Sequence, residues 1–139
     1  MYRAGAARYK QVNVQTMSRG QILLALYDTA IQYCHRAAGS IRKGDVVAKG
    51  KEIQRVSSIV GELASTLDRG VAPEFCDQLE ALYFYMQEQL ALSNAKMEPE
   101  PVEEVAKILL TLREAWGQAV EDVEGNGARH QQAQAVAAR

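Results

Sequence analysis

The residues that could carry catalysis or bind a metal are few and scattered. The only histidines are His35 and His130, and neither follows a glutamate by three residues, so the Glu-x-x-His pairs of di-iron helical bundles are absent. No C-x-x-C pair occurs, which removes the usual zinc and c-type haem arrangements. The sequence also contains no glycine loop that would cradle a phosphate and no serine in a G-x-S-x-G context. We therefore expect no metal, no cofactor and no enzymatic activity.

The remaining titratable residues fit structural or solvent-facing roles. Glu103, Glu104 and Glu114 fall on the polar face of a predicted helix. Cys34 and Cys76 stand in a chain whose first residues are basic without an apolar stretch behind them, which is not the pattern of a signal peptide. No segment approaches the roughly 20 apolar residues that cross a bilayer. We expect a cytosolic protein without membrane insertion, whose two reduced thiols serve as small core residues.

The composition is that of a folded domain without a strong net charge. The 139 residues suffice for one core, and a hydrophobic fraction of 47% argues against disorder. The formal charge is −1 and the pI is about 6.1, whereas a nucleic-acid-binding domain normally carries a basic surplus. The one basic cluster, Arg36 to Arg55, is interleaved with Asp45 and Glu52, a pattern typical of a solvated helix face. We expect no nucleic-acid partner.

The elements that must position these residues are helices. Alanine, leucine, glutamate, glutamine and lysine dominate, and apolar residues recur in alternating steps of three and four. Ser18 followed three residues later by Gln21 predicts a capping-box start, and Gly44 predicts the end of this first helix. Its apolar stripe consists of Leu23, Tyr27, Ala30, Cys34, Ala37 and Ile41.

The second and third predicted helices follow directly. Asp45 is the expected N-cap of the second helix and Gly70 its end, while the third begins around Pro73 and ends near Asn94. The stripe of the second helix consists of Val46, Ile53, Val56, Val60, Leu63 and Leu67. The stripe of the third consists of Phe75, Leu79, Leu82, Met86 and Leu90.

A fourth helix is predicted after Pro99 and Pro101, with an end at Gly125-Asn126-Gly127. Its stripe consists of Val102, Val105, Leu109, Leu112, Trp116, Ala119 and Val123. Four helices with short connections fold most simply as an antiparallel up-down four-helix bundle. We therefore predict an all-α fold in three parts: an N-terminal arm over residues 1–16, a bundle over 17–125 and a flexible tail over 126–139.

Three of the predicted helices carry more apolar residues than one core stripe needs. The runs at 22–27, 82–86 and 108–110 are apolar on consecutive residues and must face outward as well as inward. Such surface marks a partner site or a subunit interface. The alternatives are a wide core stripe, or the arm folded over the apolar surface. The arm contributes Tyr9, Val12 and Val14, which we expect to dock on this surface and to leave when a partner arrives.

Six segments, in order and at matching spacing over roughly residues 9–120, resemble the flagellar secretion chaperone family (FliS). They are 9–16 (YKQVNVQT), 23–30 (LLALYDTA), 44–50 (GDVVAKG), 59–68 (IVGELASTLD), 79–86 (LEALYFYM) and 103–116 (EEVAKILLTLREAW). The chain departs from the family pattern at Phe84, where an aspartate is expected, and at Thr29, where a glycine is expected. Arg19-Gly20 also stands where serine is often followed by proline, and Gly70 replaces a glycine pair.

The resemblance implies a cytosolic export chaperone that binds the disordered C-terminal segment of flagellin. Such a chaperone prevents premature polymerisation and keeps its client competent for flagellar type III secretion. The client segment would fold into helices on the bundle, in the helix-in-groove mode.

The residues expected to take part in client binding are two residues of the movable arm and the outward residues of the helices, which would form the client surface. They are Tyr9, Val12, Ile22, Leu26, Val56, Tyr83, Leu110 and Trp116. For Leu26 and Trp116 a core position is an equal alternative. Two other functions stay open: a regulatory adaptor that binds an anti-sigma factor or an export-gate component, and a homodimer in which the same apolar surface pairs two copies.

Overall fold

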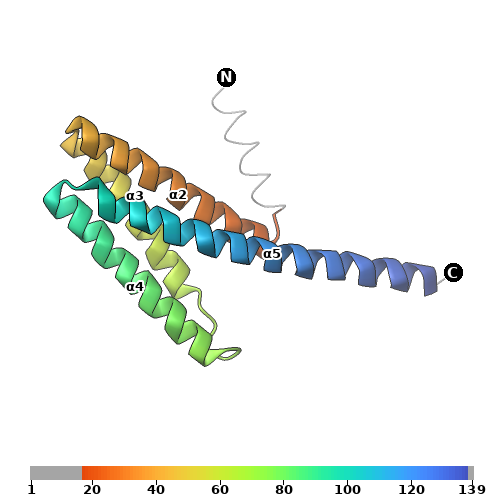
Figure 1. Ribbon diagram of the computed structural model, residues 1–139. Coiled ribbons are helices and arrows are strands. Elements are labelled where there is room, and N and C mark those ends of the chain that lie inside the picture. The colour runs from red at the N-terminus through yellow and green to blue at the C-terminus, as the bar shows by residue number, and fades with distance from the viewer. Residues whose placement is uncertain (1–16, 138–139) are drawn as a thin grey trace, which may run out of the picture. The chain divides into compact units, whose positions relative to one another are not determined.

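The computed structural model describes residues 17–137, without the side chains of Asn126 and of residues 128–131. This part of the chain forms the helices α2 (Arg19–Lys43), α3 (Val46–Ser65), α4 (Pro73–Lys96) and α5 (Pro99–Ala137), and it contains no strand (Figure 1). The prediction of an all-α fold is confirmed. None of the described helices combines the length and the apolar character that crossing a membrane requires.

The chain divides into two compact units, and α2 and α5 each run through both. The central unit is Leu26–Thr111, and the described residues of the terminal unit are 17–25 and 112–137. In the central unit the four helices form a bundle in which each runs antiparallel to the next along the chain (Figure 1). The predicted division at residues 16 and 125 stays a prediction.

The predicted starts of α2 and α3 are confirmed by their caps. The Gln21 amide donates to Ser18 Oγ at 3.1 Å and the Ser18 amide donates to Gln21 Oε1 at 3.2 Å, which is the reciprocal capping box. Asp45 caps α3 by accepting from the Ala48 amide at 3.1 Å. Gly44 separates the two helices at φ 74°, a left-handed conformation that glycine adopts without a steric penalty.

Two predicted helix ends were wrong. Helix α3 ends at Ser65 rather than at Gly70, because the hydroxyls of Ser65 and Thr66 donate to the carbonyls of Glu62 and Leu63 and so close the last turn. Helix α5 continues through residues 125–127 to Ala137. Each glycine costs about 1 kcal/mol in a helix, but an established helix gains a hydrogen bond with every added residue, and alanine and glutamine follow.

The core of the central unit is built from one buried stripe on each helix. These stripes are Tyr27, Ala30, Cys34, Ala37 and Ile41 on α2, Ile53, Val56, Ile59, Val60 and Leu63 on α3, Cys76, Leu79, Tyr83, Met86 and Leu90 on α4, and Val102, Val105, Ala106 and Leu109 on α5. The prediction was wrong for Val46 and Phe75, which are exposed. On α4 the buried stripe passes through Cys76 and Tyr83 instead of Phe75 and Leu82.

Polar side chains inside the central unit tie the helices together. Ser93 is buried and its hydroxyl accepts from the Val102 amide at 2.8 Å, which satisfies one of the free donors at the start of α5. Lys49 is also buried, and its ammonium donates to the backbone oxygen of Asn94 at 3.0 Å and to Asn94 Oδ1 at 2.8 Å. The basic cluster is therefore a solvated face except at Lys49, which links α3 to the end of α4.

Candidate functional site

The terminal unit contains a close helix crossing between the start of α2 and α5. A Cβ atom placed on Gly20 would lie 2.8 Å from each γ-methyl carbon of Val120, a separation that real Cβ contacts do not show. At the same end of α2, Ser18 Oγ donates to Glu124 Oε1 at 2.5 Å. The Glu124 carboxylate thus lies at the helix N-terminus, where the helix dipole favours a negative charge.

An open apolar groove of about 370 Å³ borders this crossing. Its apolar lining is Leu23, Trp116, Ala119, Val120 and Val123, and Ser18, Arg19, Gly20 and Glu124 complete it. Trp116 is half-buried and Val123 is 71% exposed, so the groove presents apolar side chains to solvent. Its chemistry suits an apolar side chain, because its lining is almost entirely carbon.

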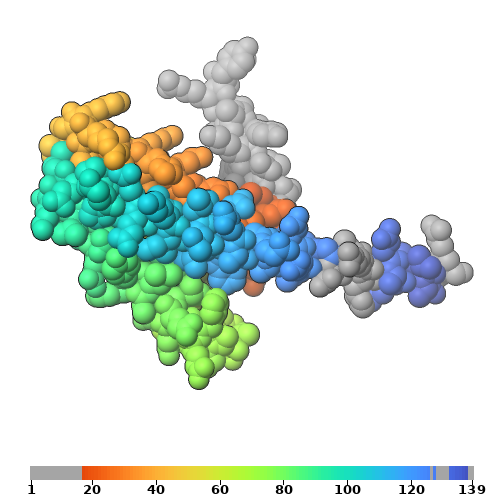
Figure 2. All heavy atoms as spheres, in the orientation of Figure 1, coloured from red at the N-terminus to blue at the C-terminus, as the bar shows by residue number. Residues whose placement is uncertain are grey.

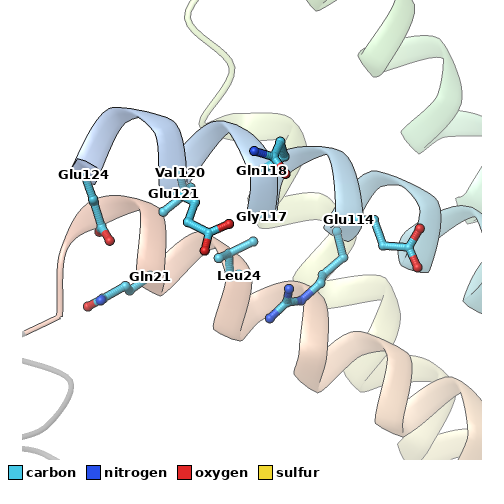
Figure 3. Close-up of a pocket in the computed structure, with 9 residues that line it drawn as sticks. Gln21, Leu24, Glu114, Gly117, Gln118, Val120, Glu121 and Glu124 are labelled. Atoms are coloured by element: carbon cyan, nitrogen blue, oxygen red, sulfur yellow. The ribbon is translucent and has the colours of Figure 1, made fainter. Parts of the chain in front are cut away.

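A second groove, of about 480 Å³, is polar (Figure 3). Leu24 of α2 points toward α5 there, and Gln21 of α2 also lines the groove. Helix α5 contributes Glu114, Gln118, Glu121 and Glu124 together with Arg113, Gly117 and Val120. Three carboxylates against one guanidinium give this side a negative charge. The two grooves share Val120 and Glu124, so an apolar floor and an acidic rim lie next to each other on α5.

The central unit exposes apolar side chains of its own. Phe84, on α4, is 66% exposed and lines a hollow of about 370 Å³ with Ala81, Arg69, Asp77 and Glu80. In this hollow Arg69 forms ion pairs with both carboxylates. The other large exposed apolar residues of the unit are Val46, Val47, Val71, Phe75, Tyr85, Leu92 and Leu110. Figure 2 shows the surfaces of α4, in green, and of the first part of α5, in cyan.

The predicted client-binding residues fall into four groups: exposed, half-buried, buried in the core, and outside the described residues. Ile22 and Leu110 are exposed, at 38% and 47%, and Leu26 and Trp116 are half-buried. Tyr9 and Val12 lie outside the described residues.

Two members of the predicted set, Val56 and Tyr83, are buried in the core, at 0% and 3% exposure. The expectation that they face outward was wrong. Tyr83 lies on the same stripe as Leu79, Met86 and Leu90, and its hydroxyl reaches that of Tyr27. Its outward neighbours in the apolar run are Phe84 and Tyr85.

Sequence reasoning missed most of the groove. It assigned Leu23, Ala119 and Val123 to core stripes and gave Gly20 and Val120 no role. The length of the fourth apolar stripe could have indicated the groove. This stripe extends to Val123, about four helical turns beyond its last buried residue, Leu109. A stripe longer than the core it serves leaves apolar residues uncovered.

No group of three or more histidine, cysteine, aspartate or glutamate side chains within the described part of the chain is arranged to hold a metal ion. His35 is exposed. Burial raises the pKa of the Cys34 thiol to about 12, so this thiol is protonated at neutral pH. These surfaces present apolar and charged side chains that a partner can contact.

A helical bundle with an open apolar groove and exposed aromatic side chains defines a protein-binding module. The profile of the family described as flagellar protein FliS matches residues 1–123, and the chain belongs to this family of flagellar secretion chaperones. This family consists of chaperones and not of enzymes.

Curated relatives and a solved structure agree with this assignment. The flagellar secretion chaperone FliS of Salmonella typhimurium is 34% identical over 124 residues, which cover 85% of this chain and 92% of that protein. The Bacillus subtilis protein of the same name is 30% identical over 113 residues, 81% of this chain and 84% of that one. The crystal structure of a bacterial flagellar chaperone has a TM-score of 0.70 and 16% identity, over 88% of this chain and 99% of that chain, and shares the fold.

Proposed function

We propose that this chain binds the C-terminal segment of flagellin in the cytosol, prevents its premature polymerisation and keeps it competent for flagellar export. The observation that carries the proposal is the apolar groove at Trp116, in a family of flagellar secretion chaperones. A secretion chaperone requires an export substrate as its partner, and an open apolar groove between helices suits an amphipathic helix of that substrate.

The mechanism follows from what the groove covers. Flagellin subunits polymerise by packing apolar helix faces together, so a chaperone that occupies such a face removes it from assembly. Ordering a disordered segment costs several kcal/mol, about 2–5, so the complex has to bury a large surface in return. One groove of this size accommodates a few side chains, and the exposed Phe84, Tyr85, Leu92 and Leu110 of the central unit supply further apolar contacts.

The acidic rim adds selectivity to the apolar groove. Glu121 and Glu124 lie beside Val120 on α5, so a client helix with a basic residue next to its apolar anchor is favoured over one with an acidic residue. Exposed ion pairs of this kind contribute little affinity, about 0–1 kcal/mol, and are weakened by salt. We therefore assign most of the binding free energy to the apolar contacts.

Calorimetric titration with the C-terminal segment of flagellin from the same organism tests this function. We expect one-to-one binding with a negative heat-capacity change, and circular dichroism of the mixture should show added helix. The variant Trp116→Ala should weaken binding on the order of tenfold or more, because an aromatic contact in a groove is a typical binding hot spot. The matched core variant Val56→Ala should lower the free energy of unfolding by about 2 kcal/mol and leave the affinity unchanged.

Absence of heat and of added helix with the wild-type chain would contradict the proposal. A regulatory partner, such as an anti-sigma factor or an export-gate component, would then be titrated in the same way. Light scattering of the free chain and of the mixture tests the homodimer alternative. A dimer that does not bind the flagellin segment would indicate that the apolar surface pairs two copies of the chain.

A further inference from the structure

The contact between Gly20 and Val120 leaves no room for a side chain at position 20. An added Cβ would meet Cγ1 and Cγ2 of Val120 at 2.8 Å and Cβ of Val120 at 3.3 Å. Valine in a helix is confined almost entirely to one χ1 rotamer, so its methyl groups cannot turn away at low cost. A larger residue at position 20 therefore moves the first turn of α2 away from α5.

The same two residues line the apolar groove, together with Leu23 and Trp116. The side chain of Ser18 makes a second contact between the two helices. Its hydroxyl accepts from the Gln21 amide and donates to Glu124. The start of α2 is thus attached to α5 by a steric contact and by a hydrogen bond. The separation of the two helices at this crossing sets the width of the groove.

We propose that Gly20 is a positioning residue for client binding: by admitting Val120, it fixes the groove at the width that takes apolar side chains of one client helix. The inference rests on the proposed function, since it deepens the role of the same groove.

The variant Gly20→Ala tests the proposal in the full-length chain, with Gly39→Ala as its matched control. Gly39 lies in the same helix, and a Cβ there would meet nothing within 4 Å. Both variants therefore replace a glycine of α2 by alanine and make the same change in the entropy of the unfolded chain. We expect Gly20→Ala to weaken binding of the flagellin segment on the order of tenfold and to shift the fluorescence emission of Trp116 in the free protein. Gly39→Ala should do neither.

Further variants distinguish an effect of the contact between Gly20 and Val120 from the effect of a general loss of structure. In the double variant Gly20→Ala/Val120→Ala the γ-methyl groups are removed, so the added Cβ at position 20 meets no obstacle. The double variant should therefore bind within about twofold of the single variant Val120→Ala, which has the same groove lining. Val120→Ile adds a methylene from the other side and should weaken binding as Gly20→Ala does, so it replaces Gly20→Ala if that variant does not fold.

The outcomes are distinguishable. Wild-type affinity in Gly20→Ala with unchanged Trp116 emission would overturn the proposal. A double variant that binds more weakly than Val120→Ala by the same factor as Gly20→Ala binds more weakly than the wild type would also overturn it. Failure of the wild-type chain itself to bind the segment would instead overturn the proposed function, and with it the client role of the groove.

Discussion

The hydroxyl oxygens of Tyr27 and Tyr83 lie 2.5 Å apart in the core of the central unit, where a hydrogen bond between them joins α2 to α4. Burial, and then this hydrogen bond, raises the pKa of Tyr83 far above its ordinary value. The Tyr83 phenol is therefore neutral at physiological pH. The contact fixes the rotation of α4 that buries Tyr83 and turns Phe84 and Tyr85 outward.

The variant Tyr83→Phe removes the hydrogen bond but keeps the ring. We expect the free energy of unfolding to fall by about 1 kcal/mol and the affinity for the client to stay unchanged. Urea denaturation and calorimetric titration measure the two effects. Tyr85→Phe, which loses an exposed hydrogen bond to Glu104, is the control and should leave the denaturation midpoint unchanged. A loss of affinity at unchanged stability would place Tyr83 on the client surface after all.

Lys49 is expected to matter for stability and not for binding. Its buried ammonium satisfies a carbonyl in the last turn of α4, where a positive charge also complements the helix dipole. Replacing it in Lys49→Met should lower the free energy of unfolding by about 2 kcal/mol, because both hydrogen bonds from a charged group to Asn94 are lost. Lys51→Met, at an exposed position of the same helix, should leave the midpoint unchanged.

The free energy of unfolding should depend on pH through the ionisation of the Cys34 thiol. Its pKa is raised from 9.0 to about 12 in the folded chain by burial. Above pH 9 the unfolded chain loses this proton while the folded chain keeps it, so the folded state binds more protons and stability falls as pH rises. The slope for this one group is about 1.4 kcal/mol per pH unit between these two pKa values. Denaturation midpoints measured from about pH 8 to 11 should fall less steeply in Cys34→Ala; equal slopes would contradict the assignment.

The N-terminal arm provides a prediction that comes from the sequence alone. If Tyr9 and Val12 occupy client-binding surface, deletion of residues 1–16 removes a competitor and should tighten binding of the flagellin segment. The full-length variant Tyr9→Ser/Val12→Ser is the control, because it keeps the length and the basic residues of the arm and should tighten binding in the same direction. Unchanged or weaker binding in both would argue against competition by the arm.

Local rules predicted most of the fold. The Ser18–Gln21 capping box, the Asp45 cap and Gly44 lie where the sequence placed them, because each depends on neighbouring residues only. The end of α5 was not predictable from the glycines at 125 and 127, since the cost of a glycine competes with the gain from extending an existing helix.

The site was predicted less well, for a different reason. A run such as 82–86 has apolar side chains on several faces, and the choice between Leu82 and Tyr83 for the core depends on a partner, Tyr27, 56 residues earlier in the chain. The groove depends on contacts between residues that are far apart in the chain, such as Gly20 and Val120. No periodicity within one helix reports a contact of that kind.

The most direct test of the central claim is the fluorescence emission of Trp116 during titration with the C-terminal segment of flagellin. Trp116 is the only tryptophan of the chain, and a client segment without tryptophan leaves it as the sole reporter of the groove. We predict a shift of the emission to shorter wavelength, complete at a ratio of one to one, because the client helix covers the half-buried indole. Binding detected by calorimetry without any change in this emission would contradict the assignment of the groove as the client site.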